Sequence, residues 1–488
     1  MPPTMAILPT LDSLKDLTRL VQKTEGFHPL VAALKNGHGA TLDGAWGSSS
    51  ALVAAALGLH APRTLVVVIA FPRDVDGWLE DVASFAGVRP VVFPAWDNLP
   101  SDETLLDEIA GQRLRVLRQL EAQEPPRYVL TTIQALTQPV PDRARLAEQR
   151  RLLKVKDQID PDVLAGWLVE HGFKRTEVVE LPGEFSRRGS VLDLFSPDSD
   201  TPHRLDFFGD EIDSIRSFSS LTQRSSGDPL PDVEVTSAAL ERPGSTTNGA
   251  PRGAHVAYTG HLCDYLPAGA WTVLVEPDDL AEQGKHYLER VTDPRGLFSV
   301  PGVFQQLLRF PNARITAMPS PSLEASCHLR IESVERFSGD VTKLRDELDA
   351  TTAGDRVVIA CHNEAESKRL SEVLATGQLA QSDRLRLVTG RVRAGFRMVD
   401  AGVAVLSDHE LFHREDVRQV LPRRRLESRA IDSFLDLAER RELVGGLLIG
   451  KSCLEFILPI AVGRQGDAGL GLAQGLELDH VAGHVEDR

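Results

Sequence analysis

Residues 64–71 (TLVVVIAF) constrain the fold most, because this run is apolar at almost every position. A strand of this composition is typical of a sheet buried on both faces, as parallel sheets are. Segments with helical spacing are expected at 74–85 and 103–120, and short strands at 90–93 and 128–132. Strands that alternate with helices predict a parallel, doubly wound α/β sheet.

The pattern changes near residue 150. A helix is expected at 161–171, with Asp160 as its N-cap and Pro161 at its first position. Closely spaced strands without helices then predict an inserted antiparallel α+β domain. These strands are expected at 178–181, 190–195, 203–208 and 214–218.

After the insert, residues 224–253 are rich in Ser, Gly and Pro and are interpreted as a linker. A strand at 271–275 resumes the first sheet, and a second small α/β domain follows. Its helices are expected at 341–348 and 365–374, and its strands at 356–360, 385–388 and 403–406. The predicted domains are therefore 1–150 (first part of the main domain), 151–225 (insert), 226–335 (linker and return segment), 336–415 (small α/β domain) and 416–488 (basic linker and divergent tail).

Composition excludes several classes of protein. A chain with 42% hydrophobic and 25% charged residues is typical of folded globular proteins, and it contains no apolar stretch of membrane-spanning length. The first residues lack the basic and apolar regions of a secretory signal, so we expect a cytoplasmic protein with no membrane partner. A net charge of −16 disfavours non-specific DNA binding. Four dispersed cysteines predict neither disulfides nor a metal site.

A loop at 44–51 (GAWGSSSA) resembles a phosphate-binding loop in its place before a helix. Such loops read GxxxxGK[ST], where Lys neutralises phosphate and Ser or Thr holds magnesium. Gly44 and Gly47 are present, but the three deciding positions are Ser49, Ser50 and Ala51. The loop is therefore interpreted as degenerate, with no catalytic residue, no cofactor and no small-molecule substrate. Glu276, which follows a strand, is better explained as part of an acidic loop than as a metal ligand.

Residues 183–224 carry the most specific motif. They read GEFSRRGSVLDLF, then RLDFFGDEIDSIR, then TQR. This segment resembles the domain shared by the excision-nuclease subunit UvrB and the bacterial transcription-repair coupling factors. The matching positions are Gly183, Glu184, Phe185, Arg188, Gly189, Asp193, Phe195, Arg204, Phe207, Phe208, Asp210, Glu211, Ile212, Arg216, Thr222, Gln223 and Arg224. Flanking segments such as 91–103 (VVFPAWDNLPSDE) resemble the coupling factors rather than UvrB.

The resemblance implies a degenerate RecA-like domain with a UvrA-binding insert. It also implies that arginines of the insert contact UvrA, because guanidinium groups pair well with carboxylates. The candidates are Arg175, Arg187, Arg188 and Arg204, with Arg188 the best match; structural salt bridges within the hairpin are the alternative. The phenylalanines at 185, 195, 207 and 208 are expected in the core.

The resemblance ends near residue 439. A basic run, Arg423–Arg425, precedes this point and is better explained as an exposed linker than as a contact for DNA or RNA polymerase. The polymerase-binding and translocase domains of the family are therefore expected to be missing from this chain. The resulting hypothesis is a UvrA-binding adaptor for transcription-coupled nucleotide excision repair that hydrolyses no ATP. The alternatives are a helicase-type NTPase, which tight binding of Mg-ATP would indicate, and a non-functional remnant, which would not bind UvrA.

Overall fold

A seven-stranded parallel sheet forms the centre of the main domain. The computed structural model describes residues 11–96, 108–241, 256–319, 325–334, 337, 343–351, 354–407 and 410–411. Every neighbouring pair in the central sheet is parallel. In spatial order the strands are β18 (Ala325–His328), β1 (Ala40–Asp43), β17 (Asn312–Thr316), β16 (Trp271–Val275), β2 (Leu65–Ile69), β4 (Tyr128–Thr132) and β3 (Val91–Phe93). The predicted parallel α/β sheet is confirmed.

Strand β2 shows why the run at 64–71 is apolar throughout. Leu65 and Val67 belong to the hydrophobic cluster on one face of the sheet, whereas Val66 and Val68 belong to the cluster on the other. Successive side chains of a strand point to opposite faces, so a strand covered on both sides needs apolar residues at every position.

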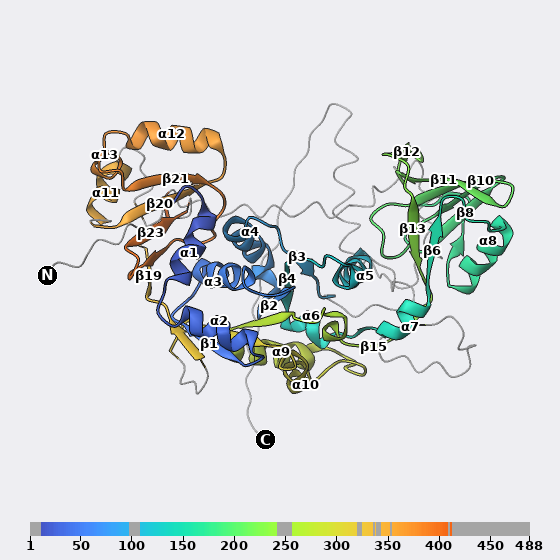
Figure 1. Ribbon diagram of the computed structural model, residues 1–488, viewed down its shortest axis with the longest axis horizontal. Helices are drawn as coiled ribbons and strands as arrows, with labels where there is room; N and C mark the ends of the chain where they lie inside the picture. Colours follow the sequence, from blue (N-terminus) through green and yellow to red (C-terminus); the bar gives the residue numbers. More distant parts are fainter. Residues whose placement is uncertain are drawn as a thin grey trace, which may run out of the picture. The chain divides into compact units, whose positions relative to one another are not determined.

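Helices cover both faces of this sheet (Figure 1). One face carries η1 (Leu14–Asp16), α1 (Leu17–Gln22), α2 (Phe27–Lys35), α3 (Ser48–Gly58) and α4 (Val75–Ala86), which follows η2 (Pro72–Asp74) in the chain. The other carries α5 (Glu108–Glu121), α6 (Ile133–Thr137), η3 (Leu262–Tyr265), α9 (Pro277–Arg290) and α10 (Val300–Leu307). A small three-stranded sheet and α7 lead to and from the insert: β5 (Val140–Pro141), α7 (Arg143–Glu148), β14 (Leu240–Glu241) and β15 (Val256–Gly260).

The insert is a six-stranded sheet covered by one helix, α8 (Pro161–Glu170), whose N-cap Asp160 accepts a hydrogen bond from the backbone of Asp162. Its pairs are antiparallel except β7 with β8. In spatial order the strands are β12 (Ser225–Ser226), β11 (Glu211–Phe218), β10 (His203–Phe208), β9 (Val191–Leu194), β8 (Glu184–Arg188) and β7 (Lys174–Arg175). The predicted inserted antiparallel sheet is confirmed.

Two local predictions for the insert are wrong. Residues 178–181 form no strand, and Val179 is buried in a small apolar cluster with Phe195 and Phe218. The expected linker at 224–253 begins as ordered structure, because β13 (Asp232–Thr236) pairs antiparallel with β6 (Arg150–Lys154). Polar strands at a sheet edge resemble a linker in composition, which explains the error. Residues 242–255 lie outside the described part of the chain.

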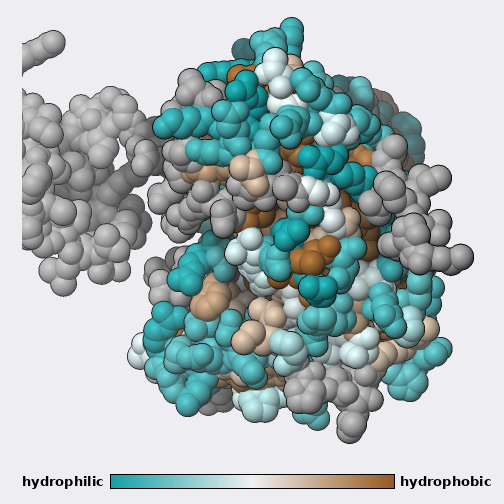
Figure 2. Space-filling view, turned by 90° about the vertical axis from the view of Figure 1, so that its left-hand side faces the viewer, coloured by the Kyte–Doolittle hydropathy of each residue, from teal (hydrophilic) through white to brown (hydrophobic). Residues whose placement is uncertain are grey.

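The small α/β domain is built on a mixed sheet, in the order β19 (Ile331–Ser333), β22 (Phe396–Met398), β23 (Val403–Leu406), β20 (Arg356–Cys361) and β21 (Leu385–Thr389). One face of this sheet packs on α11 (Leu344–Thr351), α12 (Glu364–Leu374) and α13 (Gln378–Gln381). The other face joins the hydrophobic cluster of the main domain, where the rings of Phe396 and Phe85 lie 6.3 Å apart. The side of the molecule that Figure 2 draws is mainly hydrophilic, with small, separate apolar patches.

Several predictions fall on residues that are not described, including the basic run at 423–425, the divergent tail, and the first part of the helix expected from 103. Within the described ranges, no helix has the length and apolar character needed to cross a membrane.

Candidate partner-binding surface

The insert sheet has one apolar and one largely polar face. The apolar face packs against α8 and consists of fully buried side chains: Phe185, Leu192, Leu194, Leu205, Ile212 and Ile215. By strand alternation, the residues between them face the opposite side. This polar face carries Ser186, Arg188, Asp193, Arg204 and Asp206.

Two tight hairpin turns, which join β8 to β9 and β10 to β11, lie at the same end of the strands of this sheet. Arg188 pairs with Val191 around Gly189, and Phe208 pairs with Glu211 around Gly209. Both glycines have positive φ values, 60° and 64°, which tight hairpin turns require. The neighbouring strands hold the two turns together, because the Phe207 amide donates a 2.8 Å hydrogen bond to the Ser190 carbonyl. We call residues 188–191 and 208–211 the hairpin edge.

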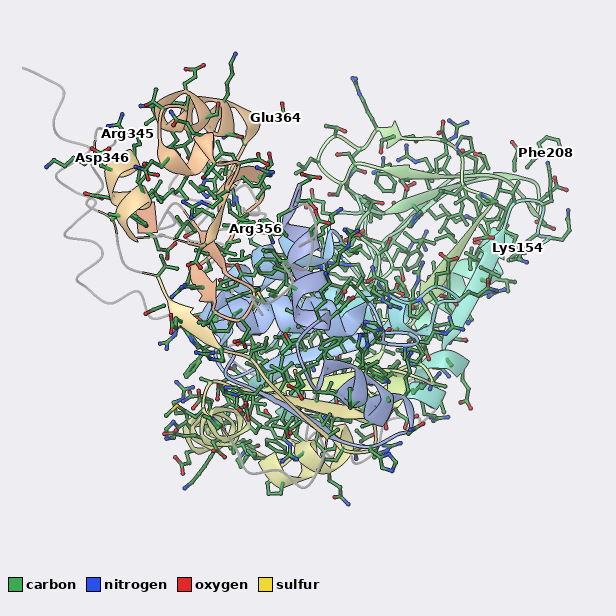
Figure 3. All side chains as sticks on the ribbon, turned by 60° about the vertical axis from the view of Figure 1, so that its left-hand side comes forward. Lys154, Phe208, Arg345, Asp346, Arg356 and Glu364 are labelled. Atoms are coloured by element: carbon green, nitrogen blue, oxygen red, sulfur yellow. The ribbon has the colours of Figure 1, made fainter. Side chains whose placement is uncertain are left out.

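Phe208 is the most exposed large apolar side chain of the hairpin edge, with 83% of its surface accessible. Figure 3 shows it at the outer end of the insert. The prediction that Phe208 is a core residue is therefore wrong, whereas Phe185, Phe195 and Phe207 are buried as predicted. Adjacent residues of a strand face opposite sides, so Phe207 and Phe208 could not both point inward. The two adjacent phenylalanines of the FFGDE motif therefore indicated that one of them points outward.

Arg188 is exposed on the polar face beside the turn at Gly189. Its guanidinium donates to the Glu177 carbonyl, and the Ser186 hydroxyl donates to the same oxygen over 3.0 Å. A guanidinium has five N–H donors, so this single contact orients the side chain and leaves donors for a partner carboxylate.

A charged brace supports the second turn of the hairpin edge. Lys156 pairs with Glu211 over 2.8 Å and with Asp213 over 3.4 Å, while Gln158 donates to Glu211 over 2.8 Å. Hydrogen bonding to Glu211 raises the pKa of Lys156 above its usual value. These contacts fix the backbone that presents Phe208, and sequence reasoning did not identify them.

The structure divides the other candidate arginines between the two faces. Arg187 pairs with Asp162 of α8, and Arg175 is exposed on edge strand β7, aligned with Phe185 on the α8 side. Arg204 lies on the polar face with Arg188. It makes a bidentate salt bridge of 2.7 and 2.8 Å to Asp193, which raises the pKa of Arg204. Arg175 and Arg204 therefore do not share an exposed face.

Helix α5 of the main domain holds the insert. Arg115 pairs with Asp200 over 3.0 Å, and Arg118 pairs with Asp198 over 3.2 Å. The Asp198 side chain is only 1% exposed and also accepts hydrogen bonds from Ser196 (2.6 Å) and Thr236 (2.8 Å). This network fixes the loop after β9 and strand β13 to the scaffold.

The nucleotide-type loop joins β1 to α3, the strand–loop–helix context expected for it. Gly44 has φ 79° and Gly47 has φ 57°. Ser49 closes the loop on itself, since its hydroxyl accepts from the Trp46 amide over 2.9 Å and donates to the Trp46 carbonyl over 2.7 Å. Ser50 and Ala51 continue into α3 and are buried.

Glu276 follows β16 in the left-handed conformation, with φ 49°. Its carboxylate accepts a 2.7 Å hydrogen bond from the Ala317 amide, and burial raises the pKa of Glu276. This contact connects the loops after β16 and β17. Among the described residues, no three or more His, Cys, Asp or Glu side chains gather as potential metal ligands.

Comparison with known proteins identifies the class to which the insert corresponds. Residues 152–239 match the UvrB interaction domain family. Three similar curated proteins are transcription-repair-coupling factors. That of Mycobacterium bovis is 33% identical over 195 residues (38% of this chain, 15% of the relative), and that of Bacillus subtilis is 30% identical over 213 residues (43% and 18%). That of Escherichia coli is 24% identical over 375 residues (66% and 32%).

The resemblance proposed from the motif at 183–224 is therefore confirmed. The chain is similar to the N-terminal, UvrB-like portion of the transcription-repair-coupling factors. It spans between about one seventh and one third of the length of these relatives.

Proposed function

We propose that this chain binds UvrA through the hairpin edge of its insert and acts as an adaptor in transcription-coupled nucleotide excision repair. The observation that carries this proposal is the exposure of Phe208 and Arg188 on two neighbouring hairpins, within the part that matches the UvrB interaction domain. Aromatic and arginine side chains dominate the binding energy of many protein interfaces.

The chemistry of the edge defines the partner surface that would fit it. Phe208 would insert into an apolar pocket, which is worth about 2 kcal/mol of burial. Arg188 would meet a carboxylate, and the bidentate geometry would set the orientation. Arg204 would act indirectly, since Asp193 already occupies its guanidinium. Arg175 and Arg187 lie on the α8 side of the sheet, where they would contact only a partner that wraps around its edge.

We also propose that the main domain is a degenerate RecA-like scaffold that does not hydrolyse ATP. The loop that follows β1 lacks the lysine and the hydroxyl residue that hold phosphate and magnesium. Residues Ser50 and Ala51 stand in their places. A cytoplasmic location follows from this role. A magnesium-dependent ATPase measurement tests the proposal, and we expect no turnover. If turnover is found and Ser50→Ala leaves it unchanged, the activity comes from another source than this loop.

Isothermal titration of the chain into purified UvrA tests the adaptor. We expect micromolar or tighter binding, weakened about 10- to 100-fold by Phe208→Ala, which removes the buried ring. Arg188→Glu is expected to abolish binding, because it places like charge against a carboxylate.

Two matched controls locate the surface. Val163→Ala trims an exposed apolar side chain on α8, on the opposite side of the insert sheet, and Arg345→Glu reverses an exposed charge in the small domain (Figure 3). Both variants should bind UvrA as the unchanged chain does. Equal weakening by Val163→Ala would move the site to the α8 face, and no binding by the folded chain would eliminate the adaptor role.

A further inference from the structure

The first turn of α3 is the position at which a phosphate-binding loop holds its anion, because the backbone N–H groups and the helix dipole point there. An open site of this kind exposes the turn to solvent. Here the residues Ser48, Ser49 and Ser50 are only 1%, 1% and 3% exposed. Protein atoms therefore cover this helix end.

The covering atoms include a segment of the small α/β domain. The Ala394 amide donates a 3.0 Å hydrogen bond to the Ser48 hydroxyl oxygen at the start of α3. Two further amides of the same segment bind α4: that of Arg393 donates to the Asp81 carboxylate over 2.8 Å, and that of Arg391 donates to the Ser84 hydroxyl over 2.9 Å. We call residues 391–394 the clamp segment.

Packing around the clamp segment is close. A Cβ atom added at Gly77 of α4 would lie 2.7 Å from Cδ of Arg393, and one added at Gly390 would lie 2.5 Å from Leu14. The Arg393 guanidinium is 3.9 Å from Asp81, whose side chain is fully buried. The clamp segment thus meets α3 and α4 through backbone, charged and apolar contacts together.

The loop before α3 is also closed from the other side. The Ser49 and Ser50 amides donate to the carbonyls of Trp46 and Gly47 over 3.2 and 3.3 Å. A Cβ atom at Gly44 would lie 1.9 Å from the Leu329 carbonyl oxygen, so the strand end after β18 passes directly against the loop. Three backbone donors of this loop, the Trp46, Ser49 and Ser50 amides, are therefore used within the chain.

We propose that the degenerate loop and the first turn of α3 serve as a docking site for the clamp segment, through the Ser48 hydroxyl, rather than as a binding site for a nucleotide phosphate. The clamp segment is an internal ligand, and it locks the small α/β domain onto the main domain. The former nucleotide loop thereby serves as a domain-docking site. This inference does not depend on UvrA binding, because the hairpin edge lies in the insert.

Hydrogen–deuterium exchange of the full chain tests the lock. In the unchanged protein, the amides of the clamp segment and of residues 44–51 should exchange slowly without any nucleotide. Ser48→Ala combined with Ser84→Ala removes two acceptors, and exchange of the clamp segment should become about tenfold faster. Ser371→Ala is the control, because that hydroxyl bonds only within its own helix, to the Lys368 carbonyl over 2.7 Å. It should leave the clamp segment unchanged.

A second measurement keeps the proposal testable should the double variant fail to fold. Millimolar Mg-ATP or inorganic phosphate, added to the unchanged chain, should alter exchange neither at 44–51 nor at 391–394. Faster exchange of the clamp segment together with protection of 44–51 would show that a nucleotide displaces it, which overturns the proposal. Rapid exchange of the clamp segment in the unchanged chain would overturn it equally.

Discussion

Replacing Arg118 with alanine should loosen the insert from the main domain. Arg118 of α5 is the cation that faces Asp198 across 3.2 Å, and Asp198 is nearly inaccessible to water. The substitution leaves that carboxylate with hydrogen bonds from Ser196 and Thr236 but removes this positive charge. A buried charge that loses its partner is costly, because desolvation is no longer offset.

The magnitude follows from distance and exposure. Two unit charges at this separation attract by roughly 5 kcal/mol at an effective dielectric constant of 20. The Arg118 side chain is 42% exposed, however, so solvent screens much of that attraction. We therefore expect Arg118→Ala to lower the local free energy of unfolding by about 2 kcal/mol. Asp198→Asn, made in the same chain, should recover part of this loss, because a neutral amide needs no cation.

Urea-dependent hydrogen exchange of peptides covering β13 measures this effect, since Thr236 of that strand bonds Asp198. A double-mutant cycle of Arg118→Ala and Asp198→Asn should give a coupling energy of about 1–2 kcal/mol. Additive changes, or a loss below about 0.5 kcal/mol for Arg118→Ala alone, would refute the reasoning that α5 holds the insert electrostatically.

Burial lowers the pKa of His261 to about 4, against 6.5 in an unfolded chain. The free energy of unfolding should therefore have its full value above pH 6.5 and fall by about 3 kcal/mol as the pH drops to 4. In His261→Asn, urea titrations at several pH values should show a smaller loss of the free energy of unfolding over this range. Gly44→Ala should cost more than about 2 kcal/mol in urea unfolding, because the new Cβ meets the Leu329 carbonyl and φ is positive; a smaller cost would mean that the loop is pliable. Phe208→Ser should change the unfolding free energy by less than about 0.5 kcal/mol, since the ring is exposed; a large thermal shift would contradict its surface position.

Strong local patterns made much of the fold predictable. The run at 64–71, the capped helix at 161–170 and the strand at 271–275 each carry their own periodicity or capping signal. Strands β19 and β22 were not predicted, because each has only three residues and neither is a continuous apolar run, as the equally short β3 is. Residues 178–181 have strand composition, yet they pair with no strand, and Val179 packs in a cluster with Phe195 and Phe218 instead.

The candidate surface was only partly predictable for the same reason. Arg188 could be identified from the motif, but the division of the arginines between two faces depends on strand register, which only the folded sheet fixes. The Arg204–Asp193 pair spans neighbouring strands, and the Arg118–Asp198 pair joins residues that are far apart in the sequence. Contacts between residues so far apart in the sequence produce no local sequence pattern from which they could be predicted. Phe208 is the exception, since alternation within FFGDE marked one of its two rings as outward-facing.

The pairing of β6 with β13 has a consequence for the evolution of such chains. These strands begin and end the insert and run side by side over five residue pairs. The chain therefore leaves the main domain and returns to it at neighbouring points, so the whole insert can be gained, exchanged or deleted without distorting the main domain. Grafting residues 150–236 between unrelated scaffolds through a short two-stranded stem is a direct use of that geometry.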